Sequence, residues 1–390
     1  MFITELSVNG FKNLKDIDIK PHDKINIFCG RNAQGKTNLI EAVWLCSGAR
    51  SFRSTKDKRM IGDDEQVMEI GVSFKNSFRE QDIRYAMAKP NIKEKSVALN
   101  GVKLKAPSKL FGSLNCVIFT PEDLELSKGS PDNRRQFLDL SVSQIKNSYN
   151  SVVSKYETLI DQRNMLLKNI NMGRSKREEL EPWDIQLAQM GAYISLLRSS
   201  YTRKLNKFAN ELYSEISGGS EKLKLTYYST VYDKKMLGTA SVYTGELTEH
   251  YLDVLHNNID DDIRAGFTQK GVHRDDMVCR INGMLVREDA SQGQHRSVAL
   301  VMKLSQAYIL HEEIDDHPVI LLDDVLSELD PSRQKFVISK IHDMQVFITC
   351  CDMNIPFDED SHGKIFNIEN GRIAKQDMTE KEKRNETGKM

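Results

Sequence analysis

The segment from Gly30 to Thr37 has the residue types and spacing of a loop that binds nucleotide phosphates. Its sequence, GRNAQGKT, fits the pattern G-x-x-x-x-G-K-[ST]. The glycines allow successive backbone N–H groups to point inward at phosphate oxygens, and Lys36 supplies a positive charge for the β- and γ-phosphates. The Thr37 hydroxyl is a candidate Mg²⁺ ligand. The residues predicted to bind ATP are Gly30, Arg31, Asn32, Ala33, Gln34, Gly35, Lys36 and Thr37.

A pair of acidic residues later in the chain could complete a site for ATP and Mg²⁺. Asp323 and Asp324 follow the apolar run Val319 to Leu322, which indicates a buried strand. Asp323 would emerge at the carboxyl end of that strand and bind Mg²⁺ directly or through water. Asp324 would act on the attacking water as a base or polariser. The alternative is an exposed pair of acids at a strand end, and the phosphate-binding loop favours the catalytic interpretation.

A third motif, SQGQHR, contains Ser291, Gly293 and Gln294 and precedes the apolar segment VALVMKLSQAYIL. Free N–H groups at the start of a helix can bind an anion. Taken alone, the pattern SxGQ indicates a helix cap more often than a ligand site. Its place upstream of Asp323 is similar to that of the signature motif in ATP-binding-cassette proteins. In that class the signature of one subunit contacts the γ-phosphate held by the other.

The elements expected around these motifs predict an α/β fold. INIFC, PVILLDDV and MQVFITCC predict buried strands, and NLIEAVWLCSGA predicts a helix after the phosphate-binding loop. The segments ITELSVNGF, KDIDIK, VMEIGVSF, DIRYAMA and SVALNGVKL predict further strands, and Asn100-Gly101 predicts a hairpin turn.

Between about residues 133 and 217 the sequence predicts two long helices separated by the polar segment NMGRSKREEL. Two helices of about 30 residues would form an antiparallel arm ~45 Å long at 1.5 Å per residue. An ordinary helical domain with its own buried core is the alternative, and both interpretations remain open. Residues 375–390 have almost no apolar content, which predicts a disordered tail.

The overall composition excludes some classes of protein. Lys and Arg number 55 and Asp and Glu 56, for a net charge of −1, so only local basic patches could indicate a nucleic-acid partner. No apolar run approaches the roughly 18 residues that would span a bilayer, so no membrane partner is expected. The six cysteines have no metal-binding spacing and mostly lie in apolar segments, which predicts buried thiols in a reducing cytoplasm.

Seven motifs in this order resemble the RecF family of bacterial DNA repair and recombination ATPases, which are related to Rad50 and SMC heads. They are FKNL, GRNAQGKTNLIEA, ARSFR, FTPEDL, GVHRDD, SQGQHR and LLDDVLSELD. The resemblance covers nearly the whole chain except the tail. It implies an ATP-binding-cassette (P-loop) ATPase head split in sequence by a helical domain with a short antiparallel arm. The head would comprise residues 1–122 and 263–374, and the helical arm domain residues 123–262.

The resemblance also implies a function. ATP would drive homodimerisation at single-/double-stranded DNA junctions or gaps, and slow, DNA-stimulated hydrolysis would release the dimer. The protein would work with RecR and RecO to load RecA. Ser291, Gly293 and Gln294 would reach across the dimer, and Asp330, which closes SELD, would lie in the loop that crosses the interface. Arg50 and Arg53 fall where related heads place basic residues near nucleotide or DNA.

The sequence departs from the wider cassette class in three places. The acid at Asp324 is one methylene shorter than the usual glutamate, which predicts slower turnover. No glutamine can be assigned to the loop that links the lobes, and the region around Glu122 is the candidate. Thr349, Cys350 and Cys351 stand where a switch histidine would follow its strand, and His342 precedes that strand.

Candidate DNA contacts are confined to local groups of basic residues, and contacts to phosphates would be independent of sequence. They are Arg50, Arg53 and Lys56 in the run from Arg50 to Arg59, Arg134 and Arg135, and Lys270, His273 and Arg274 in KGVHRDD. The first run is more simply explained as a solvated charged surface. Arg274 is followed by two acids and could instead be paired within the structure.

Three competing functions fit less well. The motor of a membrane transporter would need a coupling partner and a switch histidine. A Rad50-like or other SMC-like repair head would need far longer arms and, in Rad50, a CxxC hook, which this sequence lacks. A fused nuclease would need an additional acidic cluster, and none fits in the remaining residues.

Overall fold

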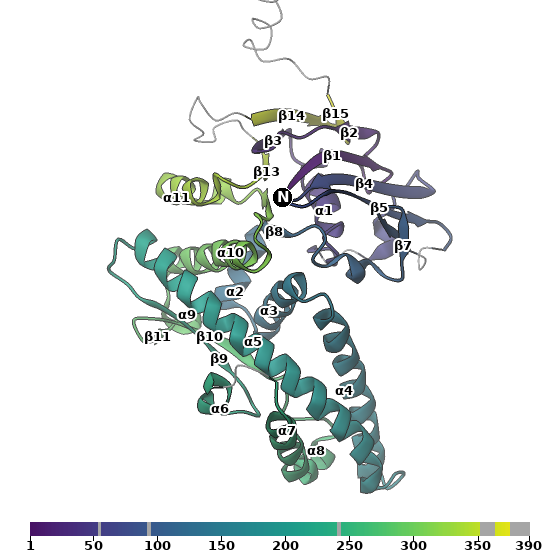
Figure 1. Cartoon of the computed structure of the whole chain (residues 1–390), viewed down its shortest axis with the longest axis vertical. Helices are drawn as coiled ribbons and strands as arrows, with labels where there is room; N and C mark the ends of the chain where they lie inside the picture. The colour runs from purple at the N-terminus through teal and green to yellow at the C-terminus, as the bar shows by residue number, and fades with distance from the viewer. Residues whose placement is uncertain (54–55, 92–94, 240–242, 352–362, 375–390) are drawn as a thin grey trace, which may run out of the picture. The chain divides into compact units, whose positions relative to one another are not determined.

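The computed structural model of this protein describes residues 1–53, 56–91, 95–239, 243–351 and 363–374 (Figure 1). The chain forms two compact units, the first containing Met1–Pro121 and Ile314–Met390 and the second Glu122–Glu313. The predicted disordered tail, 375–390, lies outside the described residues. The predicted change of domain at residues 262 and 263 is not a boundary between these units. Residues 263–313 belong with the helical segment because β10 (Asp276–Ile281) pairs with β9 (Leu223–Tyr228).

The centre of the first unit is a mainly parallel sheet with the order β15-β14-β3-β13-β12-β8. Its strands are β3 (Ile25–Cys29), β8 (Cys116–Phe119), β12 (Val319–Asp323), β13 (Val346–Cys350), β14 (Gly363–Glu369) and β15 (Arg372–Ile373). Segments from both ends of the chain therefore build one sheet. The predicted strands INIFC, PVILLDDV and MQVFITCC are confirmed as β3, β12 and β13.

A second, antiparallel sheet of the first unit has the order β2-β1-β4-β5-β6-β7. Its strands are β1 (Phe2–Asn9), β2 (Ile17–Ile19), β4 (Val67–Lys75), β5 (Glu80–Ala88), β6 (Lys95–Leu99) and β7 (Val102–Leu104). The predicted turn between β6 and β7 is confirmed, since Asn100 and Gly101 have φ values of 51° and 75°. Two positive φ values suit a two-residue hairpin turn, and Asn-Gly adopts them readily.

Helix α1 (Lys36–Leu45) follows the phosphate-binding loop and contacts strands of both sheets. This position explains why the helix is apolar on most of its circumference, with Leu39, Ile40, Val43 and Trp44 all buried. The one buried acid, Glu41, accepts hydrogen bonds from Lys12 and Ser51. The remaining elements of this unit are α11 (Pro331–Ile341) and short 3₁₀ turns at Asp57–Arg59, Pro107–Leu110 and Leu326–Glu328.

The second unit is mainly helical. Its longer helices are α3 (Pro131–Ile145), α4 (Tyr149–Asn171), α5 (Glu181–Ile216), α7 (Gly245–Asn257) and α10 (Gln292–Ile314). Its shorter elements are α2 (Glu125–Lys128), α6 (Lys234–Thr239), α8 (Ile259–Ala265), α9 (Val286–Asp289), β11 (Met284–Leu285) and 3₁₀ turns at Pro121–Leu124 and Arg177–Leu180. Strands β9, β10 and β11 form one small sheet.

The two predicted long helices are α4 and α5, and Figure 1 shows them as an antiparallel pair. They are not bare, because α7 packs on α5 and α8 packs on α4. At the far end of the pair, Leu167, Leu180 and Ile259 form a buried apolar cluster. These contacts favour a helical domain with its own core over an isolated arm.

Candidate nucleotide-binding site

The phosphate-binding loop connects the end of β3 to the start of α1. Gly30, Ala33 and Gly35 have φ values of 155°, 65° and 113°. Left-handed backbone of this kind lets a loop curl so that its N–H groups converge on an anion. Glycine is required at both ends, because a Cβ would lie 2.4 Å from the Ile368 carbonyl oxygen at Gly30 and 2.7 Å from Leu14 Cδ2 at Gly35.

Lys36 crosses the inside of this loop. Its Nζ donates to the carbonyl oxygens of Gly30 at 2.7 Å and Arg31 at 3.1 Å, and the side chain is almost fully buried. In the part of the chain that the structure describes, no carboxylate pairs with this ammonium, and neutral carbonyls hold it. The arrangement therefore fits an anionic ligand such as a phosphate, which would form stronger, charge-assisted hydrogen bonds.

Asp323 lies at the end of β12 and is hydrogen-bonded to Thr37 and to the Thr349 hydroxyl, the latter at 2.9 Å. Burial raises the pKa of Asp323, and the hydrogen bonds from Thr349 and Thr37 oppose that rise. A hydroxyl and a carboxylate in contact at the start of the α1 helix are suitable oxygen ligands for Mg²⁺. The structure thus brings together two residues that are 286 positions apart, as counted from Thr37 to Asp323.

Thr349, which the sequence places where a switch histidine would stand, contacts both acids of this site, and that contact was not predicted. It is the partner of Asp323 in the register of β12 and β13, and its Oγ1 also accepts a 2.9 Å hydrogen bond from the Asp324 amide. Asp324 has a φ of 54°, so the chain turns sharply as it leaves the strand. Thr349 therefore fixes both acids. The available signal was a threonine at the carboxyl end of a second buried strand.

A polar chain connects the outer side of the loop to the basic run. Asn13 Nδ2 donates to the Ala33 carbonyl at 3.2 Å and Asn13 Oδ1 accepts from Asn38 Nδ2 at 2.7 Å. Asn38 Oδ1 accepts from Arg53 Nη1 at 3.2 Å. Arg53 is thereby held beside the first turn of α1, and its side chain is exposed, as are those of Arg50 and Lys56.

The motif SQGQHR begins α10 and forms a capping box. The Gln294 amide donates to Ser291 Oγ at 3.3 Å, and the Ser291 amide donates to Gln294 Oε1 at 2.8 Å. Gln294 Nε2 also donates to Glu221 Oε1 at 2.7 Å. Ser291 is exposed and Gly293 is half-buried. This helix start is both a cap within the chain and a surface that another subunit could reach.

Asp330 is the N-cap of α11. Its Oδ1 accepts hydrogen bonds from the amides of Ser332 and Arg333, each at 3.1 Å, and its carboxylate pairs with the Arg333 side chain. The hydrogen bond from Arg333 lowers the pKa of Asp330. The side chain is exposed, so the cap leaves it accessible.

The GVHRDD segment is largely built into the second unit. Asp276 accepts bidentate hydrogen bonds from Arg134, with Nε at 2.7 Å and Nη2 at 2.9 Å. The buried Asp275 carboxylate accepts from Tyr227 and Thr230. The hypothesis that Arg134 contacts DNA is wrong, because its side chain is buried against Asp276. Arg274 remains exposed and stacks on Phe267, with 5.3 Å from Cζ to the ring centroid.

Comparison with known proteins identifies the family. Residues 2–374 match the family described as RecF/RecN/SMC N terminal domain. The DNA replication and repair protein RecF of Clostridium tetani is 37% identical over 372 residues, which is 95% of this chain and 99% of that protein.

The chain belongs to the RecF family.

A solved RecF structure supports the same assignment. It is described as the structure of the recombination mediator protein RecF-ATP in the RecFOR pathway, and it is 35% identical, with a TM-score of 0.85 over 96% of this chain and 97% of that one. The Smc head domain of Pyrococcus furiosus, bound to the C-terminal domain of ScpA, has a TM-score of 0.54 at 15% identity, with all of both chains covered. That second likeness shows the fold alone. The predicted α/β head fold is confirmed.

Two departures noted in the sequence have clear positions in this RecF-family chain. Glu122 follows β8, which pairs with β12, and it is the first residue of the second unit. The chain therefore passes from the first unit to the second at this segment, and its assignment as the equivalent of the missing glutamine stays a prediction. His342 is exposed at the end of α11.

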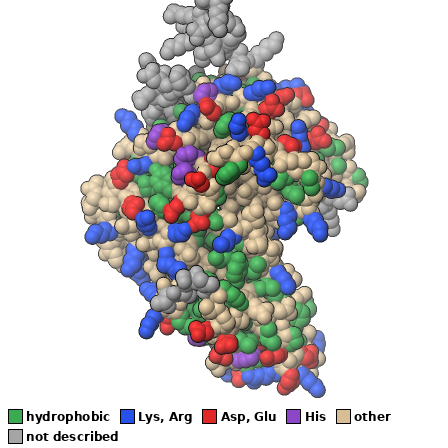
Figure 2. Space-filling model, in the orientation of Figure 1, with side chains coloured by type: hydrophobic (Ala, Val, Ile, Leu, Met, Phe, Trp, Pro, Cys, Tyr) green, Lys and Arg blue, Asp and Glu red, His purple; other side chains and the backbone are tan. Residues whose placement is uncertain are grey.

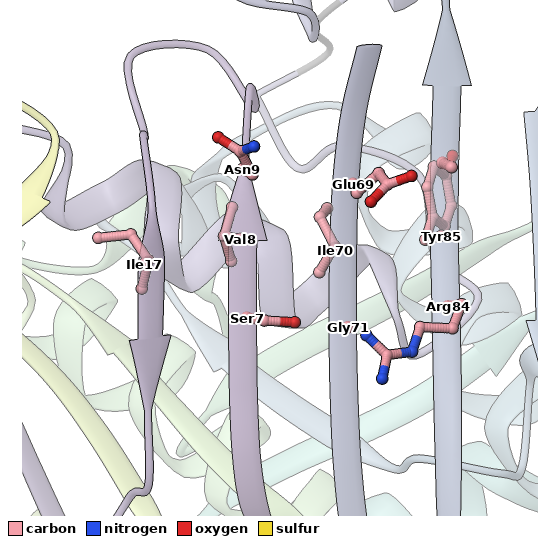
Figure 3. Close-up of a pocket in the computed structure, with 10 residues that line it drawn as sticks. Ser7, Val8, Asn9, Ile17, Glu69, Ile70, Gly71, Arg84 and Tyr85 are labelled. Atoms are coloured by element: carbon pink, nitrogen blue, oxygen red, sulfur yellow. The ribbon is translucent and has the colours of Figure 1, made fainter.

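The surface of the RecF-family chain has a cavity that lies away from the predicted site residues. A cavity of about 270 Å³ lies on the antiparallel sheet, and Figure 3 shows Ser7, Glu69, Gly71 and Arg84 around it. None of the predicted site residues lines it. On the face drawn in Figure 2, basic side chains are interspersed with acidic ones. Among the described residues, no helix has the length and hydropathy needed to cross a membrane.

Proposed function

We propose that this RecF-family protein is an ATP-dependent DNA-binding protein of recombinational repair and replication restart. The observation that carries the proposal is the pair formed by the phosphate-binding loop and the Thr37–Asp323 contact. The RecF structure with ATP, which is 35% identical, supports ATP as the nucleotide. In this proposal the head function draws on residues 1–122 and 263–374, of which residues 263–313 fold with the helical residues 123–262 in one unit.

Residues Gly30 to Thr37 would hold the triphosphate. Lys36 would exchange its two carbonyl partners for phosphate oxygens, and Thr37 and Asp323 would hold Mg²⁺. When bound, Mg²⁺ would neutralise charge on the β- and γ-phosphates. The hydrogen bond between Thr37 and Asp323 supports this assignment because it brings a hydroxyl and a carboxylate together.

ATP would also drive formation of a homodimer. Ser291, Gly293 and Gln294 of one subunit would contact the γ-phosphate held by the other, and Asp330 would lie in the loop that crosses the interface. The exposure of Ser291 at the start of α10 supports this part.

Hydrolysis would be weak, stimulated by DNA, and would act as a switch that releases the dimer. Asp324 would orient or deprotonate the attacking water, while Thr349 fixes the backbone of Asp324 and the carboxylate of Asp323. An aspartate reaches less far than a glutamate, which supports slow turnover.

The DNA would be gapped or carry a single-/double-stranded junction, with binding independent of sequence. Arg50, Arg53, Lys56 and Arg274 are the proposed contacts, and their exposure supports them. RecR would be the direct partner, with RecO and RecA in the same cytoplasmic pathway. The relation to a recombination mediator of the RecFOR pathway supports these partners.

The test is the molar mass by light scattering with and without ATP, Mg²⁺ and gapped DNA. Wild type should double in mass with ATP, and more completely with DNA. Asp324→Asn should remain dimeric with ATP bound, and Ser291→Arg should bind ATP as a monomer without dimerising. If Ser291→Arg dimerised normally, the role of the signature across the interface would be wrong. A protein that stayed monomeric in every condition would contradict the ATP-driven dimer.

A further inference from the structure

Three of the six cysteines lie at the phosphate-binding loop, and the proposed function uses none of them. Cys29 ends β3 and Cys350 ends β13, and their sulfur atoms are 3.1 Å apart. Cys351 Sγ donates to Asn32 Oδ1 at 2.9 Å and lies 3.5 Å from Lys36 Nζ. Cys351 is exposed, whereas the other five are buried as the sequence predicted.

The geometry of Cys29 and Cys350 suits a covalent bond. They are register partners on neighbouring parallel strands, so their side chains point to the same face of the sheet. Adjacent strands are about 4.8 Å apart, a separation compatible with the roughly 4.4–6.8 Å between the Cα atoms of a disulfide. Closing the sulfur atoms from 3.1 Å to a bond needs a movement of only about 1 Å.

The environment also distinguishes this pair from the core thiols. The hydrogen bond from the Cys350 thiol, and to a smaller extent the Lys36 ammonium, lowers the pKa of Cys29 although burial opposes the shift. Burial alone raises the pKa of Cys46 to about 12. Because the thiolate is the reactive form, Cys29 is a better nucleophile than Cys350.

We propose that Cys29 and Cys350 are an oxidative modification site, in which a peroxide converts the two thiols into a reversible disulfide that disables ATP binding. The Cys29 thiolate attacks a peroxide oxygen, the O–O bond breaks, and a sulfenic acid forms with release of water or alcohol. Cys350 then attacks that sulfur and a second water leaves. The two thiols together lose two electrons and two protons, and the peroxide gains them. This inference rests on the ATP site of the proposed function.

The bond would act on both halves of the nucleotide site. Cys29 is covalently attached to Gly30, the first residue of the phosphate-binding loop. The Gly30 carbonyl in turn accepts from Lys36. Cys350 follows Thr349, which fixes Asp323 and Asp324. Drawing the two strand ends together therefore displaces the start of the loop and the support of the acids at once.

The experiment treats the full-length protein with hydrogen peroxide and measures the Kd for ATP before oxidation, after it, and after reduction with dithiothreitol. Peptide mass spectrometry identifies the bond. We expect a peptide pair linked through Cys29 and Cys350, an ATP affinity at least 10-fold weaker, and full recovery on reduction. ATP and Mg²⁺ added first should slow the oxidation, because the phosphates would draw Lys36 away from the thiols.

Four variants, each compared with its own reduced form, make the result specific. Cys29→Ser and Cys350→Ser should make ATP binding insensitive to peroxide, and either suffices if the other folds poorly. Cys46→Ser, which removes a core thiol, and Cys351→Ser should remain sensitive.

Sensitivity that is lost only in Cys351→Ser would overturn the proposal in favour of direct oxidation of the exposed thiol. No Cys29–Cys350 link, or a link without a change in affinity, would also overturn it. If the reduced wild type did not bind ATP, the proposed ATP site itself would be wrong. That outcome differs from a failure of the cysteine proposal, in which the reduced protein still binds ATP.

Discussion

The phosphate-binding loop and the GVHRDD segment are both short, contain glycine and carry charged residues, yet their charges have different partners. In the loop, the partners of Lys36 among the described residues are the backbone carbonyls of Gly30 and Arg31 and the thiol of Cys351. In GVHRDD, Asp276 is neutralised by Arg134 from α3. A charge that the chain itself neutralises stabilises the fold, whereas one held by neutral groups remains available to a ligand. The difference separates a binding site from a structural motif.

The largest expected effect tests the loop side of this comparison. Lys36→Ala should weaken ATP binding at least about 100-fold, or about 2.7 kcal/mol, because the charge-assisted hydrogen bonds to phosphate are lost. Titration with a fluorescent ATP analogue would measure the change. The urea midpoint should move little, since only hydrogen bonds to neutral carbonyls disappear. Lys20 is an exposed lysine directly after β2. Lys20→Ala is the control and should keep the ATP affinity of wild type. Retained ATP affinity in Lys36→Ala would remove Lys36 from the nucleotide site.

The next effect tests the structural side. Arg134→Ala should lower the free energy of unfolding by about 3 kcal/mol, because it leaves the Asp276 carboxylate without its partner in a mostly buried position. Urea denaturation followed by circular dichroism would measure it. The matched control is Arg177→Ala, whose pair with Asp260 is exposed and should contribute less than about 1 kcal/mol. Weakened DNA binding in Arg134→Ala without a loss of stability would contradict the structural role.

The same comparison shows what the sequence could predict. Local patterns were sufficient for β3, β12, β13, the α4–α5 pair and the Asn100-Gly101 turn, because each depends on periodicity or turn chemistry within a few residues. The loop and the two acids were likewise recognisable from type and spacing.

Partners far apart in sequence could not be predicted. Arg134 and Asp276 are 142 positions apart, and only the packing of α3 on β10 brings them together. Thr349 gained its role from the register of β13 with β12, which no local pattern specifies. Strand pairing and helix packing therefore decide these contacts, whereas the motifs themselves can be read within a few residues.

A smaller effect concerns His273 in GVHRDD. Burial lowers the pKa of His273 to about 4, the hydrogen bond with the Thr268 carbonyl opposes that shift, and the charges of Arg274 and Arg135 add to it. Its ring nitrogens contact the Tyr156 hydroxyl and the Thr268 carbonyl. The unfolded chain, with a histidine pKa near 6.5, binds the proton more readily between pH 6.5 and 4. Stability contributed by neutral His273 is therefore lost as the pH falls through that window, by at most about 3 kcal/mol.

The measurement is the free energy of unfolding of wild type and His273→Gln from pH 7.5 to pH 4.5. The difference between them should shrink as the pH falls, because the variant has no proton to gain at this position. A constant difference would show that His273 is not held neutral. If His273 instead contacted DNA phosphates as a cation, the variant would lose DNA affinity below pH 6.5 without changing the slope of stability.

The smallest effect concerns Asp330, where the structural and the ligand-facing roles coincide in one side chain. Asp330→Ala removes the cap of α11 and should cost about 1 kcal/mol of stability, whereas Asp330→Asn keeps an oxygen for the amides of Ser332 and Arg333 and should cost less. If capping is the whole role, the ATP-dependent dimer seen by light scattering should be unaffected by Asp330→Asn. If Asp330 also lies at the interface between subunits, Asp330→Asn should weaken the dimer while the helix remains stable. If only Asp330→Ala weakened the dimer, the role of Asp330 would be to stabilise the fold, as the role of Asp276 is.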